Sequence, residues 1–163
     1  MAAPEPSFPV LALPERGPYQ DRVGVVIEAA SAAHVQAVTA LWQACGLTRP
    51  WNDPRADFAT ALESGNAVLV AREGDTLAGS VMVGFDGHRG WVYYLAVAPD
   101  RRRAGLGRAL MTAAEAWLRA KGAPKIQLMV REDNAEAIGF YEALGMEQQK
   151  VVTLGRFFVK EAS

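Results

Sequence analysis

The stretch from residue 90 to residue 130 constrains the fold more than any other part of this sequence. A β-rich run, GWVYYLAVA, is followed by the turn-like RRRAG, by a helical pattern from Gly105 to Lys121, and by a second β-rich run, KIQLMV. A strand, a helix and a strand in direct succession form a right-handed crossover, which places the two strands side by side and parallel. The sequence therefore predicts a sheet with at least one parallel pair.

Weaker signals place the other elements around this unit. Short turn-forming links join three β-rich runs, residues 66–73, 76–85 and 90–98, as in an antiparallel meander. Capping and breaking residues predict two earlier helices and hydrophobic patterns predict the rest, giving a first strand at 22–30, helices at 31–46, 54–64 and 135–144, and a last strand at 150–159. The expected order is β-α-α-β-β-β-α-β-α-β, an α/β (α+β) fold with a mixed sheet of six to seven strands.

Length and composition exclude several classes of protein. With 163 residues the chain fits one domain, and five of its nine prolines fall in the first 20 residues, so we expect a flexible tail at 1–21 and a single domain at 22–163. A formal charge of -1 gives no global field that favours nucleic acid or an anionic membrane. The single cysteine, Cys45, the lack of a long apolar run and the lack of a basic region at the N-terminus predict a cytoplasmic protein.

The predicted helix start at Gly105 carries the strongest functional signal. The first N–H groups of a helix have no partner inside the helix, and the helix dipole adds partial positive charge there. Glycine at 105 and 107 leaves the amides of residues 103–108 open to a ligand, and Arg102 and Arg103 can add hydrogen bonds to phosphate oxygens. This pattern predicts a pyrophosphate site. A turn of solvated charges is the alternative.

Two motifs then resemble a known family. The glycines match neither the triphosphate loop, which ends in Lys-Ser/Thr, nor the dinucleotide pattern G-x-G-x-x-G. They match R-x-x-G-x-G from Arg102 to Gly107, and N-x-x-A-x-x-x-Y-x-x-x-G is met at residues 134–145. Together these resemble the coenzyme-binding motifs of the GNAT N-acetyltransferase superfamily over about residues 22–160, and LWQACGLTRPWNDP and GFDGHRG resemble its small bacterial YpeA-type acetyltransferases.

The resemblance implies an acetyl-CoA-dependent N-acetyltransferase without a metal, in a GNAT fold whose parallel strand pair splays apart. It implies that an amine attacks the thioester directly, that a backbone N–H near Ala96 or Val97 faces the developing oxyanion, and that Tyr141 is the general acid that protonates the leaving thiolate. The implied coenzyme contacts are Leu95, Ala96, Val97, Arg102, Arg103, Ala104, Gly105, Leu106, Gly107, Arg108, Asn134 and Tyr141. Tyr141 could instead be a core residue, and Asn134 a helix cap.

The general base is missing from the positions where the resemblance places it. One family position holds Met129 here and the other holds Trp91. An α-amine, with a pKa near 8, is about one-tenth neutral at pH 7, whereas a lysine side chain is neutral about once in a few thousand molecules. We therefore expect a small-molecule or peptide α-amine as acceptor, or a base supplied by Asp86, His88 or Asp53.

The acceptor site implied by the resemblance lies between two sets of loops. Its candidate residues are Trp51, Asn52, Asp53, Asp86 and His88. Aromatic faces beside carboxylates suit a cationic amine, although NDP is also ordinary turn chemistry. The alternatives are a non-catalytic acyl-CoA-binding module and, much more weakly, a nucleic-acid contact by the three arginines. The sequence leaves monomer and homodimer open, because a last strand on a sheet edge could pair between subunits.

Overall fold

The computed structural model describes residues 24–159. These fall into two compact units, one ending at Met129 and the other beginning at Val130. The tail expected at 1–21 lies outside the described residues. A single domain over residues 22–163 stays a prediction.

A five-stranded sheet organises the first unit. Its strands lie in the order in which they occur along the chain: β1 (Val25–Ala29), β2 (Ala67–Glu73), β3 (Thr76–Phe85), β4 (Gly90–Val97) and β5 (Ile126–Gln127). The first four strands are antiparallel neighbours, and β5 pairs with β4 in parallel. The sheet is mixed, as the sequence predicts, and the crossover between β4 and β5 is present.

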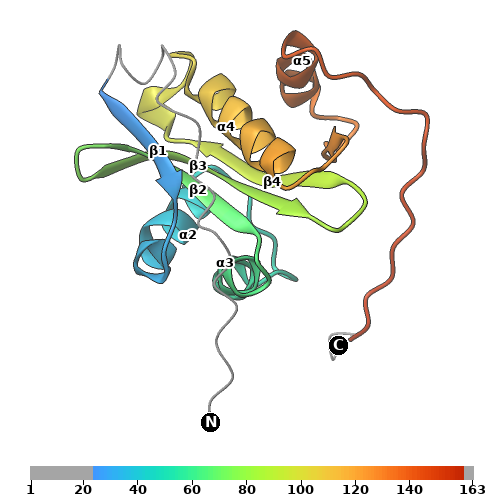
Figure 1. The fold of residues 1–163 in the computed structure, drawn as a ribbon, viewed down its shortest axis with the longest axis horizontal. Coiled ribbons are helices and arrows are strands. Elements are labelled where there is room, and N and C mark those ends of the chain that lie inside the picture. The colour runs from blue at the N-terminus through green and yellow to red at the C-terminus, as the bar shows by residue number, and fades with distance from the viewer. Residues whose placement is uncertain (1–23, 160–163) are drawn as a thin grey trace. The chain divides into compact units, whose positions relative to one another are not determined.

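Helices cover both faces of this sheet. Figure 1 shows α4 (Leu106–Ala120) on one face and α2 (Val35–Ala44) with α3 (Pro54–Glu63) on the other. The short 3₁₀ turns η1 (Ala32–His34) and η2 (Pro99–Arg101) precede α2 and α4. Under α2 and α3 the core gathers around Val38, Trp42 and Phe58, which are almost completely buried against side chains of β2 and β4. Burial of this apolar surface holds α2 and α3 against the sheet.

Two glycines set how closely α4 approaches the sheet. A Cβ on Gly79 would lie 2.9 Å from the Ala96 carbonyl oxygen and 2.9 Å from Leu110, and a Cβ on Gly90 would lie 2.5 Å from Leu118. All three distances are shorter than the contacts of real Cβ atoms, so leucine side chains of α4 occupy the space that side chains on the sheet would need. Because the two glycines meet different turns of the helix, they fix its height and its position along the sheet.

A β-bulge interrupts β4 near its end. Ser80 pairs with Ala96 and Met82 with Tyr93, so Tyr94 and Leu95 together lie opposite the single residue Val81. Tyr94 has φ 52°, a left-handed value that is uncommon for a residue with a side chain. In a regular strand neighbouring side chains point to opposite faces, but an extra residue breaks that alternation. The bulge directs Tyr93 and Tyr94 to the same side of the sheet.

The parallel pair is very short. β5 pairs with β4 only at Gly90 and Trp91, whereas β4 continues to Val97. Among the described strands, none pairs with the far edge of β4 beyond Trp91. The expected strand at 125–130 is thus reduced to two residues, and the two parallel strands part after them.

The second unit contains one helix, α5 (Ala135–Ala143), followed by a long segment without regular structure. The strand expected at 150–159 is absent, so the expected six to seven strands become five within residues 24–159. Val152, Leu154 and Phe158 are 85 to 97% exposed there. β-rich composition alone does not make a strand, because a strand needs a neighbouring backbone to complete its hydrogen bonds.

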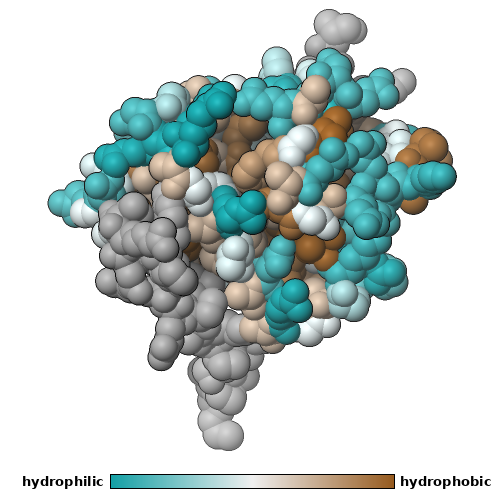
Figure 2. All heavy atoms as spheres, turned by 90° about the horizontal axis from the view of Figure 1, so that it is seen from above, coloured by the Kyte–Doolittle hydropathy of each residue, from teal (hydrophilic) through white to brown (hydrophobic). Residues whose placement is uncertain are grey.

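The surface gives no sign of a membrane span in the described part of the chain. Figure 2 shows hydrophilic residues over much of one face, with hydrophobic residues visible between them. Between residues 24 and 159 no helix combines the length and the hydrophobicity that crossing a bilayer requires.

Candidate active site

The N-terminus of α4 is the predicted pyrophosphate site, and it has the geometry of an open helix end. Gly105 precedes the helix with φ 86°, and Arg103 also lies in the left-handed region with φ 65°. No side chain caps this end, whereas Asp53 caps α3 by accepting hydrogen bonds from two backbone amides. The amides at an uncapped helix start and the helix dipole together favour an anion.

The arginines before α4 differ in what they contact. Arg101 is ion-paired with Glu73 of β2, so its charge is already balanced. Residues 102–105 are exposed, and the Nε of Arg102 lies 3.4 Å from the Val97 carbonyl oxygen, across the end of β4. Arg102 and Arg103 therefore lie between the open helix end and the last residue of the strand.

The last residue of β4 presents its backbone away from β3. The Ala98 amide donates to the Ala78 carbonyl at 2.8 Å, and in an antiparallel pair only every second residue points toward the partner strand. Val97 therefore faces the open edge, where its carbonyl accepts from the Cys45 thiol at 3.4 Å and from Arg102. Such an edge can pair with the amide groups of an extended ligand, as it would with another strand.

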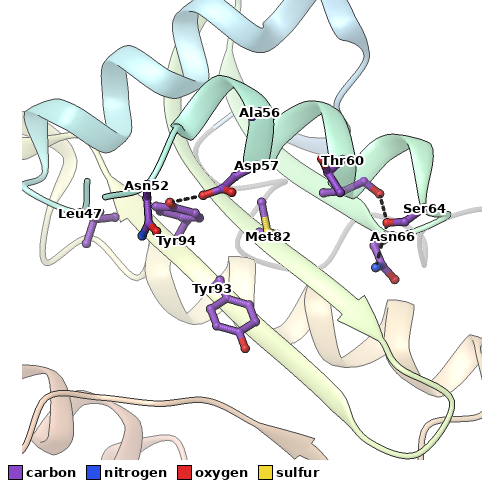
Figure 3. A pocket seen from close by; sticks show the side chains of 11 residues that line it. Leu47, Asn52, Ala56, Asp57, Thr60, Ser64, Asn66, Met82, Tyr93 and Tyr94 are labelled. Atoms are coloured by element: carbon purple, nitrogen blue, oxygen red, sulfur yellow. Dashed lines mark hydrogen bonds between the residues drawn. The ribbon is translucent and has the colours of Figure 1, made fainter. Parts of the chain in front are cut away.

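A cavity of about 610 Å³ lies between α3 and the sheet. Figure 3 shows its labelled polar side chains on and beside α3, across from Met82 of β3 and the two tyrosines of β4. The lining residues are Leu47, Asn52, Ala56, Asp57, Thr60, Ala61, Ser64, Asn66, Met82, Tyr93 and Tyr94. One wall is therefore rich in hydrogen-bonding groups and the other is aromatic and apolar.

A short hydrogen bond in this cavity joins Asp57 to Tyr94. The Tyr94 hydroxyl donates to Asp57 Oδ2 at 2.7 Å (Figure 3). The Tyr94 ring stacks on Trp42 with ring centres 4.1 Å apart and planes 7° apart, and the Trp42 indole donates to the buried Ser80 hydroxyl at 3.0 Å. Burial raises the pKa of Tyr94, and the hydrogen bond and charge of Asp57 raise it further, so the hydroxyl stays protonated and keeps donating.

Tyr93 forms the open side of the cavity. Its side chain is 44% exposed, and burial together with the negative charge of Asp86 raises its pKa. Asp86 itself accepts hydrogen bonds from the amides of His88 and Arg89 and from the Trp91 indole, and these bonds lower its pKa. Asp86 therefore lies near the cavity mouth, and its carboxylate oxygens are occupied by hydrogen bonds within the β3–β4 turn and to Trp91.

Of the five acceptor residues expected from sequence, only Asn52 lines the cavity. Asp53 caps α3, where its carboxylate accepts from the amides of Arg55 and Ala56. Trp51 is 50% exposed beside Asn52, and His88 is exposed in the turn that Asp86 organises. The structure gives Asp53 and Asp86 local hydrogen-bonding roles, and their role as a base stays a prediction.

The predicted residues of the second unit have local contacts of their own. Asn134 caps α5 by accepting from the Ala137 amide at 3.1 Å. Tyr141 packs edge-to-face on Phe140 with ring centres 5.0 Å apart, and burial raises its pKa. The cap was one of the two roles that the sequence left open for Asn134, and a coenzyme contact by either residue stays a prediction.

Asp57, Tyr93 and Tyr94 are not among the site residues that the sequence predicts. A signal for Asp57 was present, because Asp57, Thr60 and Ser64 recur at helical spacing and define one polar face of α3. No comparable signal exists for the tyrosines, since their shared orientation depends on the bulge.

Comparison with known proteins agrees with this geometry. The acetyltransferase (GNAT) family profile matches residues 34–146. An acetyltransferase of Pectobacterium atrosepticum is 47% identical over 127 residues, which cover 77% of this chain and 90% of that protein. An uncharacterized N-acetyltransferase of Yersinia pestis is 48% identical over 122 residues, which cover 74% and 86% of the two chains.

Solved structures show the same fold. The ribosomal-protein-S18-alanine N-acetyltransferase of Escherichia coli superposes with a TM-score of 0.65 at 26% identity, covering 74% of this chain and 76% of that one. Aminoglycoside N-acetyltransferase AAC(6')-Iy, solved in complex with CoA, gives a TM-score of 0.71 at 19% identity, covering 83% and 95%. The fold, the profile and the relatives agree: this chain belongs to the acetyltransferase (GNAT) family and is an N-acetyltransferase.

Proposed function

We propose that the protein transfers an acetyl group from acetyl-CoA to the amine of a small molecule or peptide. The observation that carries this proposal is that two sites share one strand. The end of β4 at Val97 lies beside the uncapped start of α4, and the bulge a few residues earlier turns Tyr93 and Tyr94 into the cavity. A thioester held along this edge would therefore end near the cavity that holds the amine.

The residues at the start of α4 suit the diphosphate of coenzyme A. The uncapped amides of the first turn provide hydrogen-bond donors, Gly105 and Gly107 keep side chains away from them, and Arg102 and Arg103 provide charge. The neighbouring Ala104, Leu106 and Arg108 belong to the same turn, and Leu95, Ala96 and Val97 form the strand edge for the extended arm. When bound, acetyl-CoA supplies an acetyl group that is activated as a thioester.

Tyr141 is the proposed proton donor to the departing sulfur. Its pKa is raised by burial, so its hydroxyl carries a proton at neutral pH, when a thiolate with an ordinary pKa near 8.5 accepts one. Asn134 is proposed as a coenzyme contact in addition to its role as a cap. The amine can release its own proton to water, because Tyr93 leaves the cavity accessible to solvent.

Two measurements test this proposal. Calorimetry should show that the folded protein takes up acetyl-CoA, and a panel of primary amines and peptides should accelerate CoA release, with mass detection of the N-acetylated product. Tyr141→Phe should lower kcat with at most a small loss of affinity for acetyl-CoA, because the ring keeps its packing contacts and only the hydroxyl is lost. Absence of acetyl-CoA binding would remove the proposal, and binding without amine-dependent CoA release would favour a non-catalytic acyl-CoA-binding module.

A further inference from the structure

The cavity under α3 has an uneven charge. Among its eleven lining residues Asp57 is the one carboxylate, and none of the eleven is a lysine, arginine or histidine. The other groups that can ionise there are the hydroxyls of Tyr93 and Tyr94, whose raised pKa values keep them neutral at pH 7. The cavity thus contains a single negative charge from its own walls.

Neighbouring side chains hold the Asp57 carboxylate in a fixed position, and these side chains do not have to move when a substrate binds. Tyr94 binds one of its oxygens at 2.7 Å, and Tyr94 is in turn fixed by stacking on Trp42, which is completely buried and hydrogen-bonded to Ser80. A carboxylate can accept several hydrogen bonds, so one from Tyr94 leaves acceptor capacity for an ammonium group. Preorganisation of this kind strengthens binding because little entropy is lost when the ligand arrives.

The Asp86 carboxylate, which acts on Tyr93 at the side of the cavity, has a different role. Asp86 influences Tyr93 electrostatically from the β3–β4 turn. Its oxygens already accept hydrogen bonds from two backbone amides and from the Trp91 indole. Asp86 therefore adds to the negative potential at the mouth, while Asp57 offers the direct contact inside. A ligand with several positive charges would find only one such partner in the cavity wall.

We propose that Asp57, positioned by Tyr94, binds the ammonium group of the acceptor and makes this enzyme selective for amines that carry a single positive charge. This inference rests on the proposed acetyltransferase function and specifies its acceptor. Asn52, Thr60, Ser64 and Asn66 provide amide and hydroxyl groups around the cavity, so the acceptor also carries neutral hydrogen-bonding groups. An α-amine beside an amide and an amino sugar both have this chemistry.

The contact between Asp57 and the ammonium group lowers the reactivity of the amine, and the pH dependence of kcat measures this effect. A carboxylate beside an ammonium group favours the charged form, so Asp57 raises the pKa of the bound amine. The ammonium ion must release a proton to water before its nitrogen forms the C–N bond. As the C–N bond forms and the C–S bond breaks, the nitrogen loses a second proton, and the sulfur leaves with the electron pair and takes up one proton, so that one proton is released overall. The Asp57 contact therefore improves amine binding and moves the rise of kcat with pH to higher pH.

The experiment compares Asp57→Asn with Glu63→Gln, which removes the same charge from an exposed position on the same helix. Alaninamide and glucosamine serve as singly charged acceptors and spermidine as a multiply charged one. We expect Asp57→Asn to raise KM for the single cations about 10- to 100-fold, since hydrogen bonds to charged groups contribute about 1.5–3 kcal/mol. In Asp57→Asn, the pH at which kcat reaches half of its maximum (the pH midpoint) should fall by about one unit. Glu63→Gln should stay within twofold of wild type.

Two further measurements keep the outcome clear. Tyr94→Phe should raise KM a few-fold and lower the pH midpoint less than Asp57→Asn does. With wild-type protein, 2-hydroxypropanamide, which replaces the amine of alaninamide by a hydroxyl, should bind at least tenfold more weakly than alaninamide, and this test needs no variant to fold.

Different results would contradict the role of Asp57 and the proposed acetyltransferase function. Unchanged KM and pH midpoint in folded Asp57→Asn, equal binding of the hydroxyl analogue, or faster turnover of spermidine than of both single cations would overturn the role of Asp57. Failure of wild type to bind or acetylate either single cation, while it still binds acetyl-CoA, would also overturn it. Failure to bind acetyl-CoA at all would instead remove the proposed function.

Discussion

The start of α4 and the cavity under α3 flank the same strand, yet they are built in opposite ways. The helix start is made from consecutive residues, and the groups proposed to bind the coenzyme are backbone amides exposed by Gly105. The cavity is made from residues between Leu47 and Tyr94 on several elements, and its binding groups are side chains. The first depends on local backbone angles and the second on long-range packing. Substitutions should therefore separate coenzyme binding from amine binding.

Gly105→Asp should give the largest effect, a loss of acetyl-CoA affinity at the start of α4 without an effect on the cavity under α3. It places a carboxylate where we propose that the phosphates bind, at a residue with φ 86°, so we expect acetyl-CoA affinity to fall at least 100-fold. Gly105→Asn is the matched control, because asparagine tolerates left-handed angles and has no charge, and it should cost much less. Calorimetry measures both. Equal losses in the two variants would mean that charge is not the cause.

Trp42→Phe should instead affect the cavity under α3, by lowering stability and weakening amine binding. The variant loses the indole hydrogen bond to buried Ser80 and some packing under Tyr94, which should lower the free energy of unfolding by about 2–3 kcal/mol. Urea denaturation measures the loss. KM for alaninamide should rise several-fold while acetyl-CoA affinity stays within twofold. A fall in coenzyme affinity as large as the rise in KM would break the separation of the two regions.

Gly79→Ala and Gly90→Ala test whether the position of α4 controls the coenzyme site. Both add a methyl group where leucines of α4 approach the sheet, so each should destabilise the fold by about 1–3 kcal/mol. Gly79 lies against the first turns of α4 and Gly90 against Leu118 near its end, so only Gly79→Ala should also weaken acetyl-CoA binding, by a few-fold. The same loss of affinity in both variants would argue against this.

Asp86→Asn should give the smallest effect, and one that depends on pH. Hydrogen bonds from backbone amides and Trp91 lower the folded-state pKa of Asp86 below its unfolded value near 3.9. Its contribution to stability is therefore present above that unfolded value and is lost as the pH falls through the folded one. The difference in Tm between wild type and Asp86→Asn should shrink from pH 6 to pH 3. A constant difference would show that the carboxylate charge does not matter there.

The two regions also differ in how far the sequence could predict them. The helix start was predictable because Gly105, Gly107 and the arginines are neighbours in the chain, and short-range physics fixes what they form. The meander, the crossover and the two early helices were predictable for the same reason. The strand at 150–159 was not, because its apolar residues match a strand pattern but the partner that would pair with them cannot be inferred from the segment itself.

The cavity could not have been predicted residue by residue. Asp57 contacts Tyr94 across 37 positions of sequence, and that contact requires an extra residue in β4 that breaks the alternation of side chains. Asp53 was expected in the acceptor site because it lies beside aromatic residues in a polar loop, and the structure shows that its carboxylate caps α3, a role that the loop pattern also allows. Asp57, one turn further along the helix, lies on a polar face that the sequence pattern indicates, but a helical aspartate usually faces solvent, so the pattern alone does not place it in a cavity.

The bulge at Tyr94 and Leu95 limits how this enzyme can change during evolution. Loss of one residue from β4 would restore regular alternation, turning Tyr94 toward α4 and displacing the Val97 edge in the same event. If both substrates bind as proposed, the length of this strand cannot change without disturbing both sites. New acceptor preferences must instead arise on α3 and the loop before it, where a side chain can be exchanged without disturbing the thioester.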